Sequence, residues 1–196
     1  MTTTRLVLVR HGETDWNATE RCQGTTDVPL NERGLSQAEA LAAALGDVDF
    51  DAAYTSPLER ARRTAEIILE GRHLRAASVD GLHEISYGAR HGLTPHEWPT
   101  GEWNRWSADP WSVTFPDGES LHGVRERAAP LIESIVSAHA GETVLISAHG
   151  HLNRVLLIHA GHASPDSFWT IAQPNGGAWI IDYNLNGATR CHEFHR

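Results

Sequence analysis

The sequence contains no lysine, and all 16 of its basic residues are arginine. Any mechanism that needs a lysine Schiff base is therefore excluded, and so is a P-loop lysine. Arginine, whose planar guanidinium can bind a phosphate through two hydrogen bonds at once, is left as the only strong fixed cation.

Cysteine and long apolar runs are also scarce. The two cysteines, Cys22 and Cys191, show no CxxC spacing and cannot form a disulfide framework, which favours a reducing compartment. The apolar run near the N-terminus covers only residues 6–9, too short for a signal peptide or a membrane span, and no later run reaches the length of a span. We therefore expect a cytoplasmic protein that does not bind membranes.

Acidic residues outnumber basic ones by 25 to 16, which gives a formal net charge of −9. This balance disfavours nucleic acid as a partner, although a local basic pocket is compatible with it. The 196 residues contain no repeat, low-complexity tract or linker, and the length suits one α/β domain. We expect a single domain over residues 1–196, and a homodimer is left open.

Buried-strand patterns alternate with helical patterns along the chain. The continuous apolar run at 6–9 and the segment Thr-Val-Leu-Ile-Ser at 143–147 are typical of strands buried on both faces of a parallel sheet. The other predicted strands cover 52–55, 178–183 and 190–194, with a turn over 184–187, and helices are predicted over 35–45, 59–70, 119–139 and 152–159. The pattern predicts an α/β fold with a mostly parallel central sheet and helices on both faces.

Residues 88–118 show neither the helical period nor the alternation of a strand, and they contain four tryptophans and four prolines. A long irregular stretch inside a compact domain is typical of a lid or a binding loop. Two interpretations of the tryptophans stay open. They pack together and exclude water, or one or two of them line a pocket and select an aromatic or sugar ring.

Two of the predicted buried strands run into loops of the same kind. Arg-His-Gly at 10–12 follows the first strand, and Ala-His-Gly at 148–150 follows the strand at 143–147. Ligand sites in such sheets lie beyond the carboxyl ends of the strands, so we expect His11 and His149 to lie close together. Each glycine lets backbone N–H groups approach a ligand.

Arginines and one carboxylate complete a candidate constellation. Arg60, Arg62 and Arg63 stand at the start of a predicted helix, where free N–H groups and the helix dipole favour an anion. Glu84 precedes the irregular segment. Each residue alone has an ordinary explanation, since 13 histidines are scattered along the chain and surface arginines are usually solvated. Together they indicate a phosphate pocket with a nucleophile and an acid.

The residues at 8–17, Leu-Val-Arg-His-Gly-Glu-Thr-Asp-Trp-Asn, resemble the signature of the histidine phosphatase superfamily in its phosphoglycerate-mutase-like branch. Three further segments fall where that family has its own: Gln-Gly…Asp-x-Pro-Leu within 21–30, the second-arginine helix at 55–65, and the second-histidine loop at 147–150. The four segments occur in order and span nearly the whole chain. The resemblance implies the fold of that family.

The resemblance also implies a phosphohistidine mechanism that needs neither a cofactor nor a metal. In it His11 is the nucleophile and Glu84 the proton donor. The transferring phosphoryl group is bound by Arg10, Arg60 and His149. Further positions expected to contact phosphate or substrate are Asn17, Gln23, Gly24, Tyr87, Arg90, Gly150 and His151. From the chemistry of the residues alone, neighbouring arginines should keep His11 unprotonated, and a backbone carbonyl is expected to fix its tautomer.

Our interpretation is a phosphatase that hydrolyses a small-molecule phosphate monoester through a phosphohistidine on His11. The alternative is a phosphoglycerate mutase with the same chemistry. The family's Phe-Gly-x-Trp-Glu-Gly is replaced by Tyr-Gly-Ala-Arg-His-Gly at 87–92, and His151 stands where the mutases commonly carry asparagine. Between Glu84 and the helix at 119–139 the only cations are Arg90 and Arg105, and this short, lysine-free insert favours the phosphatase.

Three other functions are weaker. A phosphoprotein phosphatase would be favoured by an open, flat lid. A non-enzymatic sensor of phosphorylated ligands is disfavoured because both His11 and Glu84 are present. A dinucleotide-binding module is disfavoured because no G-x-G-x-x-G follows the first strand.

Overall fold

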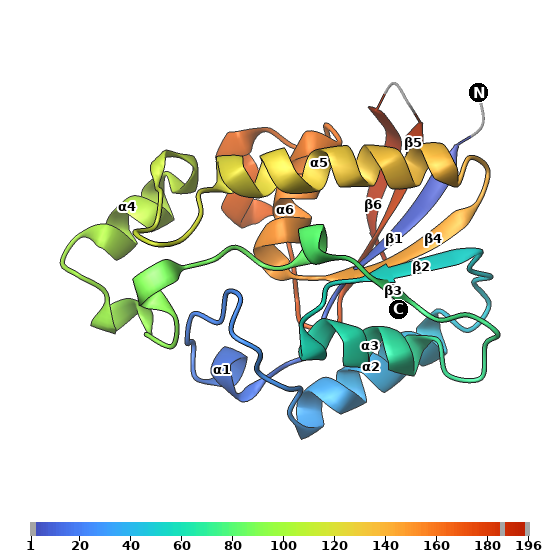
Figure 1. The fold of residues 1–196 in the computed structure, drawn as a ribbon, viewed down its shortest axis with the longest axis horizontal. Coiled ribbons are helices and arrows are strands. Elements are labelled where there is room, and N and C mark those ends of the chain that lie inside the picture. The colour runs from blue at the N-terminus through green and yellow to red at the C-terminus, as the bar shows by residue number, and fades with distance from the viewer. Residues whose placement is uncertain (1–2, 185–186, 195–196) are drawn as a thin grey trace.

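The centre of the computed structural model is one six-stranded sheet, and the structure describes residues 3–184 and 187–194. The strands lie in the order β3-β2-β4-β1-β5-β6 (Figure 1). Their bounds are β1 Thr4–Arg10, β2 Ala52–Thr55, β3 Ala77–Ser78, β4 Thr143–Ala148, β5 Ala178–Asn184 and β6 Gly187–Phe194. The five predicted strands are present. The two-residue strand β3 was not predicted, and the predicted turn over 184–187 includes residues outside the described part of the chain.

The pairing of the strands confirms a mostly parallel sheet. β1 pairs parallel with β4, β4 with β2 and β2 with β3, whereas β5 and β6 are antiparallel additions at one edge. In the register Arg10 lies beside Ala148, and Thr55 lies beside Ser147. The carboxyl ends of β1, β4 and β2 therefore meet at one edge of the sheet, where ligand sites of such folds form.

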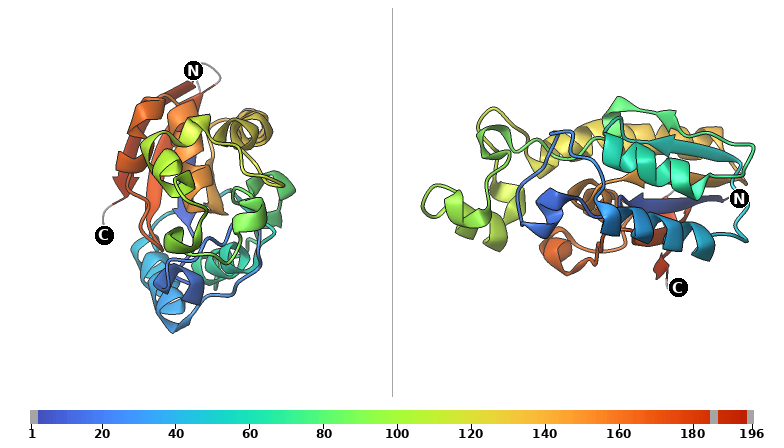
Figure 2. Two further views of the ribbon diagram at one scale, coloured as in Figure 1. Left: turned by 90° about the vertical axis from the view of Figure 1, so that its left-hand side faces the viewer. Right: turned by 90° about the horizontal axis from the view of Figure 1, so that it is seen from below.

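Helices cover both faces of the sheet, as the sequence predicts. They are α1 Asp15–Ala18, α2 Glu32–Ala44, α3 Glu59–Ile68, α4 Glu102–Ala108, α5 Leu121–Ala138 and α6 Gly150–His159. Leu6 and Leu8 of β1 pack in one core cluster with residues of α5 and α6, whereas Val7 and Val9 pack in a second cluster with α2 and α3. The view from below in Figure 2 shows α2 and α3 on the near side of the sheet. Alternate residues of a buried strand thus serve two cores.

The segment at 88–118 forms a cap that projects beyond the end of the sheet (Figure 1). It is less irregular than the sequence predicts, because it contains α4 and the short 3-10 helices Gly88–Arg90, Pro95–Glu97 and Pro110–Ser112. A helix of seven residues between prolines is too short to show a clear period. The cap is held by aromatic packing, since Trp98 and Trp106 are buried and both rings contact Tyr87 and Phe115.

None of the helices in the described part of the chain is both long enough and apolar enough to cross a lipid bilayer.

Candidate active site

A cavity of about 250 Å³ lies where the carboxyl ends of the parallel strands meet the cap. Residues from the β1 loop, from α3, from the segment before the cap and from α6 contribute to its wall. The lining residues are Arg10, His11, Trp16, Asn17, Glu20, Arg21, Cys22, Gln23, Gly24, Arg60, Glu84, Tyr87, Pro95, Trp103, Trp106, Gly150, His151, Arg154 and Trp169. Positions distant in the sequence are brought together here by the sheet register.

His11 is buried at the bottom of this site, with both ring nitrogens engaged. Its Nδ1 lies 2.6 Å from the carbonyl oxygen of Gly12, and its Nε2 lies 3.2 Å from Nε of Arg60. A guanidinium can only donate, so Nε2 must carry the lone pair and Nδ1 must donate its proton to Gly12. The expected backbone carbonyl is confirmed, and Nε2 is the nucleophilic nitrogen of this tautomer.

The surroundings keep the His11 imidazole neutral. Burial, followed by the charges of Arg60 and Arg10, lowers the pKa of His11 well below its ordinary value, and only weaker contributions from Gly12 and Glu84 oppose this. This is the predicted direction, and burial is a larger cause than the arginines. A neutral imidazole is the nucleophilic form, so His11 is available to attack across the neutral pH range.

Two cations lie beside His11: Arg60, which is fully buried, and Arg10, which is partly buried. Arg60 donates from its terminal nitrogens to the carbonyls of Thr26 and Gly24, both at 2.7 Å, which fixes the guanidinium plane. Arg10 donates to the carbonyl of Gln173, and its buried Nε makes no hydrogen bond with the described residues. Burial lowers the pKa of each arginine to about 10, so both remain cations at neutral pH.

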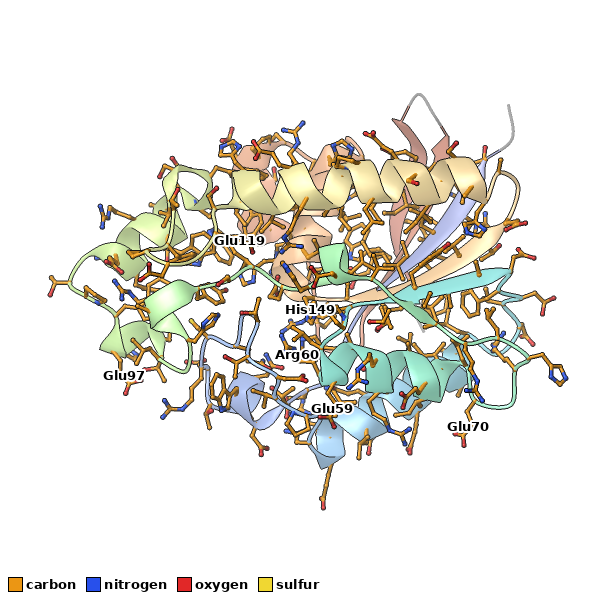
Figure 3. All side chains as sticks on the ribbon, in the orientation of Figure 1. Glu59, Arg60, Glu70, Glu97, Glu119 and His149 are labelled. Carbon is orange, nitrogen blue, oxygen red and sulfur yellow. The ribbon has the colours of Figure 1, made fainter. Side chains whose placement is uncertain are left out.

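His149 lies against His11, as the sequence predicts. The two ring centroids are 5.2 Å apart, and Nε2 of His149 is 2.7 Å from the Ser56 hydroxyl (Figure 3 labels Arg60 and His149 near the middle of the molecule). Burial and the charge of Arg60 lower the pKa of His149 well below its ordinary value. Its Nδ1 is buried without a hydrogen-bond partner among the described residues. His149 is fully buried and is not among the residues that line the cavity.

Glu84 is buried at the N-terminus of α6. Its carboxylate accepts hydrogen bonds of 3.0 Å from the backbone N–H groups of Ile85, His151 and Leu152, and it lies 3.4 Å from the His151 ring. Burial alone raises the pKa of Glu84, but the hydrogen bonds from His151 and the charges of His151 and His149 outweigh it and hold the pKa well below its ordinary value. The carboxylate is therefore ionised in the ligand-free protein.

Most of the other predicted contact residues reach the cavity. The structure places six of the seven in its wall: Asn17, Gln23, Gly24, Tyr87, Gly150 and His151. Arg90 is not among them, because its guanidinium pairs with both carboxylate oxygens of Glu102 at 2.7 and 2.9 Å. Trp98 is buried in the aromatic packing, whereas Trp103 and Trp106 also line the cavity. Selection of an aromatic or sugar ring by the lining tryptophans stays a prediction.

Sequence reasoning missed several residues of the site. The Asn175 amide donates to the carbonyls of His11 and Gly12 and to Asn17, and the Thr64 hydroxyl accepts from the Gly12 N–H. Asn175 lies in none of the predicted motifs, and Thr64 lies in the segment at 55–65, where only the arginines were singled out. Arg154 also lines the cavity, and its place three residues after His151, on the same face of α6, is the one signal that could have found it.

Among residues 3–184 and 187–194, no three His, Cys, Asp or Glu side chains lie together as a metal site would require.

Comparison with known proteins agrees with this geometry. A family model described as "Histidine phosphatase superfamily (branch 1)" matches residues 6–193. The chain belongs to this superfamily, whose members with similar sequences include both phosphatases and phosphoglycerate mutases.

The chain is 37% identical over 163 residues to the "Uncharacterized phosphatase PhoE" of Bacillus subtilis, with 83% of this chain and 80% of that protein covered. It is 36% identical over 170 residues to a 2,3-bisphosphoglycerate-dependent phosphoglycerate mutase of Gloeobacter violaceus, covering 82% of this chain and 77% of the mutase. Among solved structures it resembles Bacillus stearothermophilus YhfR, with a TM-score of 0.87, 34% identity and 94% of each chain covered.

Proposed function

We propose that this protein is a phosphatase that hydrolyses a small-molecule phosphate monoester through a phosphohistidine on His11. The observation that carries the proposal is the state of the His11 ring, whose Nδ1–H is held by the Gly12 carbonyl and whose lone pair is on Nε2, beside the arginines Arg60 and Arg10. Phosphoryl transfer depends chiefly on positioning and on stabilising negative charge, and this site supplies both.

In the first step Nε2 of His11 attacks phosphorus while the bond from phosphorus to the ester oxygen breaks. Arg10, Arg60 and His149 bind the phosphoryl oxygens during the transfer. The ester oxygen takes a proton and leaves as the alcohol, and Glu84 supplies that proton. In the second step water attacks the phosphohistidine, gives a proton back to Glu84, and releases phosphate and neutral His11.

Glu84 must gain a proton before it can act as an acid. A bound dianionic phosphate places further negative charge beside the carboxylate and so raises the pKa of Glu84 from the low value of the free enzyme. His151, 3.4 Å from the carboxylate, lines the cavity and provides a contact through which a proton can arrive. The proton is then held where the ester oxygen leaves.

A phosphoglycerate mutase is the second candidate, because the chain resembles mutases as closely as it resembles phosphatases. The two functions differ in whether water or a second substrate oxygen accepts the phosphoryl group. The cap favours the phosphatase, since it has no lysine and since Arg90 is already paired with Glu102.

A panel of phosphate esters tests the proposal. It includes 3-phosphoglycerate with and without 2,3-bisphosphoglycerate, and both free phosphate and 2-phosphoglycerate are measured. We expect free phosphate to appear together with an equal amount of alcohol. Rapid formation of 2-phosphoglycerate without release of phosphate would show that the protein is a mutase.

A further inference from the structure

Arg154 is a cation of the cavity that the phosphohistidine mechanism does not use. It lies on α6, three residues after His151 on the same helix face, and it lines the cavity. Its Nε donates to the carbonyl of Ile171 at 3.0 Å, and its guanidinium carbon lies 5.6 and 5.7 Å from the ring centroids of Phe168 and Trp169. The side chain is thus held in place by one carbonyl and two aromatic rings.

Arg154 has no carboxylate partner, in contrast to two other half-buried arginines, Arg90 and Arg127. Arg72 is also half-buried without a carboxylate, but its terminal nitrogens donate to the backbone carbonyls of Val48, Leu45 and Gly46. Arg90 pairs with Glu102, and Arg127 with Glu119, each through close nitrogen–oxygen contacts of 2.7 to 2.9 Å. In the described part of the chain no carboxylate lies within 4.0 Å of the Arg154 guanidinium. Its two terminal nitrogens make no hydrogen bond with these residues, and they are not enclosed.

The charge of Arg154 affects the pKa values of other residues in the site. After burial and Glu84, Arg154 is the next cause that affects the pKa of Arg10, which it lowers, and it also lowers the pKa of His151. Burial lowers the pKa of Arg154 itself, and Glu84 partly opposes this. A partly buried cation is costly when it has no counter-ion and its terminal nitrogens donate to no protein group, so its presence beside a ligand cavity favours a ligand that brings an anion.

We propose that Arg154 is a specificity-determining residue that binds a carboxylate on the alcohol portion of the substrate. The inference rests on the proposed phosphatase function and names the class of its substrate: a phosphate monoester that also carries a carboxylate. Arg10 and Arg60 hold the phosphoryl group at the His11 end, and Arg154 holds the second anion.

The chemistry of the guanidinium favours a carboxylate as that anion. With Nε bound to Ile171, the two terminal nitrogens remain, and this pair matches the two oxygens of a carboxylate. A second phosphate carries about two charges, and Arg154 is a single cation. Trp169 and Trp103, both partly exposed at 38% and 36%, line the same cavity and provide apolar surface for the carbon skeleton between the two anionic groups.

Pairs of esters that differ in the carboxylate test this assignment. Phosphoserine is compared with phosphoethanolamine, and 3-phosphoglycerate with glycerol 1-phosphate, in the wild-type protein and in Arg154→Gln and Arg154→Lys. For each pair, the kcat/KM of the carboxylated ester is divided by that of the ester without the carboxylate. We expect Arg154→Gln to lower this ratio by about 10- to 100-fold, mainly by raising KM for the carboxylated ester. Arg154→Lys keeps the charge and should recover part of the ratio. Arg105→Gln, which removes a charge from the cap outside this cavity, should leave the ratio unchanged.

A purely structural role for Arg154 predicts an equal loss on both members of each pair, and that result would overturn the proposal. A loss that is larger for an ester with a second phosphate than for a carboxylated one would overturn the choice of carboxylate. Hydrolysis of p-nitrophenyl phosphate by the wild-type protein tests the phosphatase function separately. If no ester is hydrolysed, calorimetric titration of the same pairs into His11→Ala, with and without Arg154→Gln, still decides whether Arg154 recognises the carboxylate.

Discussion

The two ends of the cavity are built in different ways. At the His11 end, the functional groups stand on loops that directly follow β1 and β4 and on the first turn of α3, so the sheet register sets their distances. At the cap end, the wall consists of aromatic side chains from short helices and turns, packed through ring contacts. From this difference we infer that one end defines the reaction and the other the substrate. Variants at the two ends should therefore affect different measurements.

The largest effect among the site variants other than His11 is expected for Glu84→Gln on an alkyl phosphate. An alkoxide is a poor leaving group, and a positioned acid contributes about 10²- to 10⁴-fold. A p-nitrophenolate leaves without this help, so the loss of kcat/KM should be far smaller for p-nitrophenyl phosphate. Equal losses on both esters would mean that Glu84 only supports the N-terminus of α6. The control Glu97→Gln removes an exposed carboxylate on the cap, labelled in Figure 3, and should change neither value.

A smaller loss is expected for Arg60→Gln, which removes one buried donor from the His11 end. We expect kcat to fall by about 10²- to 10³-fold, as for other oxyanion donors. Because the charge of Arg60 helps to lower the pKa of His11, its removal should raise that pKa. Protonated His11 cannot attack, so the acidic limb of the pH–rate profile should move to higher pH.

Arg62→Gln is the matched control, because Arg62 lies two residues away on the same helix and is exposed. An acidic limb that stays in place in Arg60→Gln would contradict the electrostatic coupling between Arg60 and His11.

The smallest effect on the reaction is expected at the cap, where two neighbouring tryptophans serve different purposes. Trp98 is buried, and Trp98→Ala should lower the free energy of unfolding by about 3–5 kcal/mol. Trp103 is partly exposed and lines the cavity, so Trp103→Ala should cost less than about 1 kcal/mol but raise KM for bulky esters. Denaturant unfolding and steady-state kinetics separate the two. If Trp103→Ala changed kcat for p-nitrophenyl phosphate as much as it changes KM for bulky esters, the two ends of the cavity would not have separate functions.

The His11 end of the cavity could be predicted from the sequence much better than the cap end. The strands at 6–9 and 143–147 were predictable because a strand buried on both faces is a continuous apolar run. His11 and His149 were predictable because each follows such a strand directly. The alignment of both loops at one edge then follows from parallel pairing.

The cap and its surroundings depend on contacts that no local pattern reveals. Arg90 was expected at the substrate, but its partner Glu102 lies 12 residues further along and is reached only because the chain folds back through short 3-10 helices. α4 was not predicted, since seven residues show little period. Arg154 was missed because a single arginine on a helix is an ordinary feature until its surroundings are known.

The central claim is that His11 forms a covalent phosphohistidine, and trapping that species tests it most directly. The protein is mixed with a radiolabelled phosphate ester, quenched in alkali within one turnover, digested, and mapped by mass spectrometry. We expect acid-labile, alkali-stable phosphate on the peptide that contains His11, and none in His11→Ala, whose turnover should fall by at least about 10⁴-fold. Turnover by the wild-type protein without label on His11, or label on the His11→Ala variant, would contradict the account.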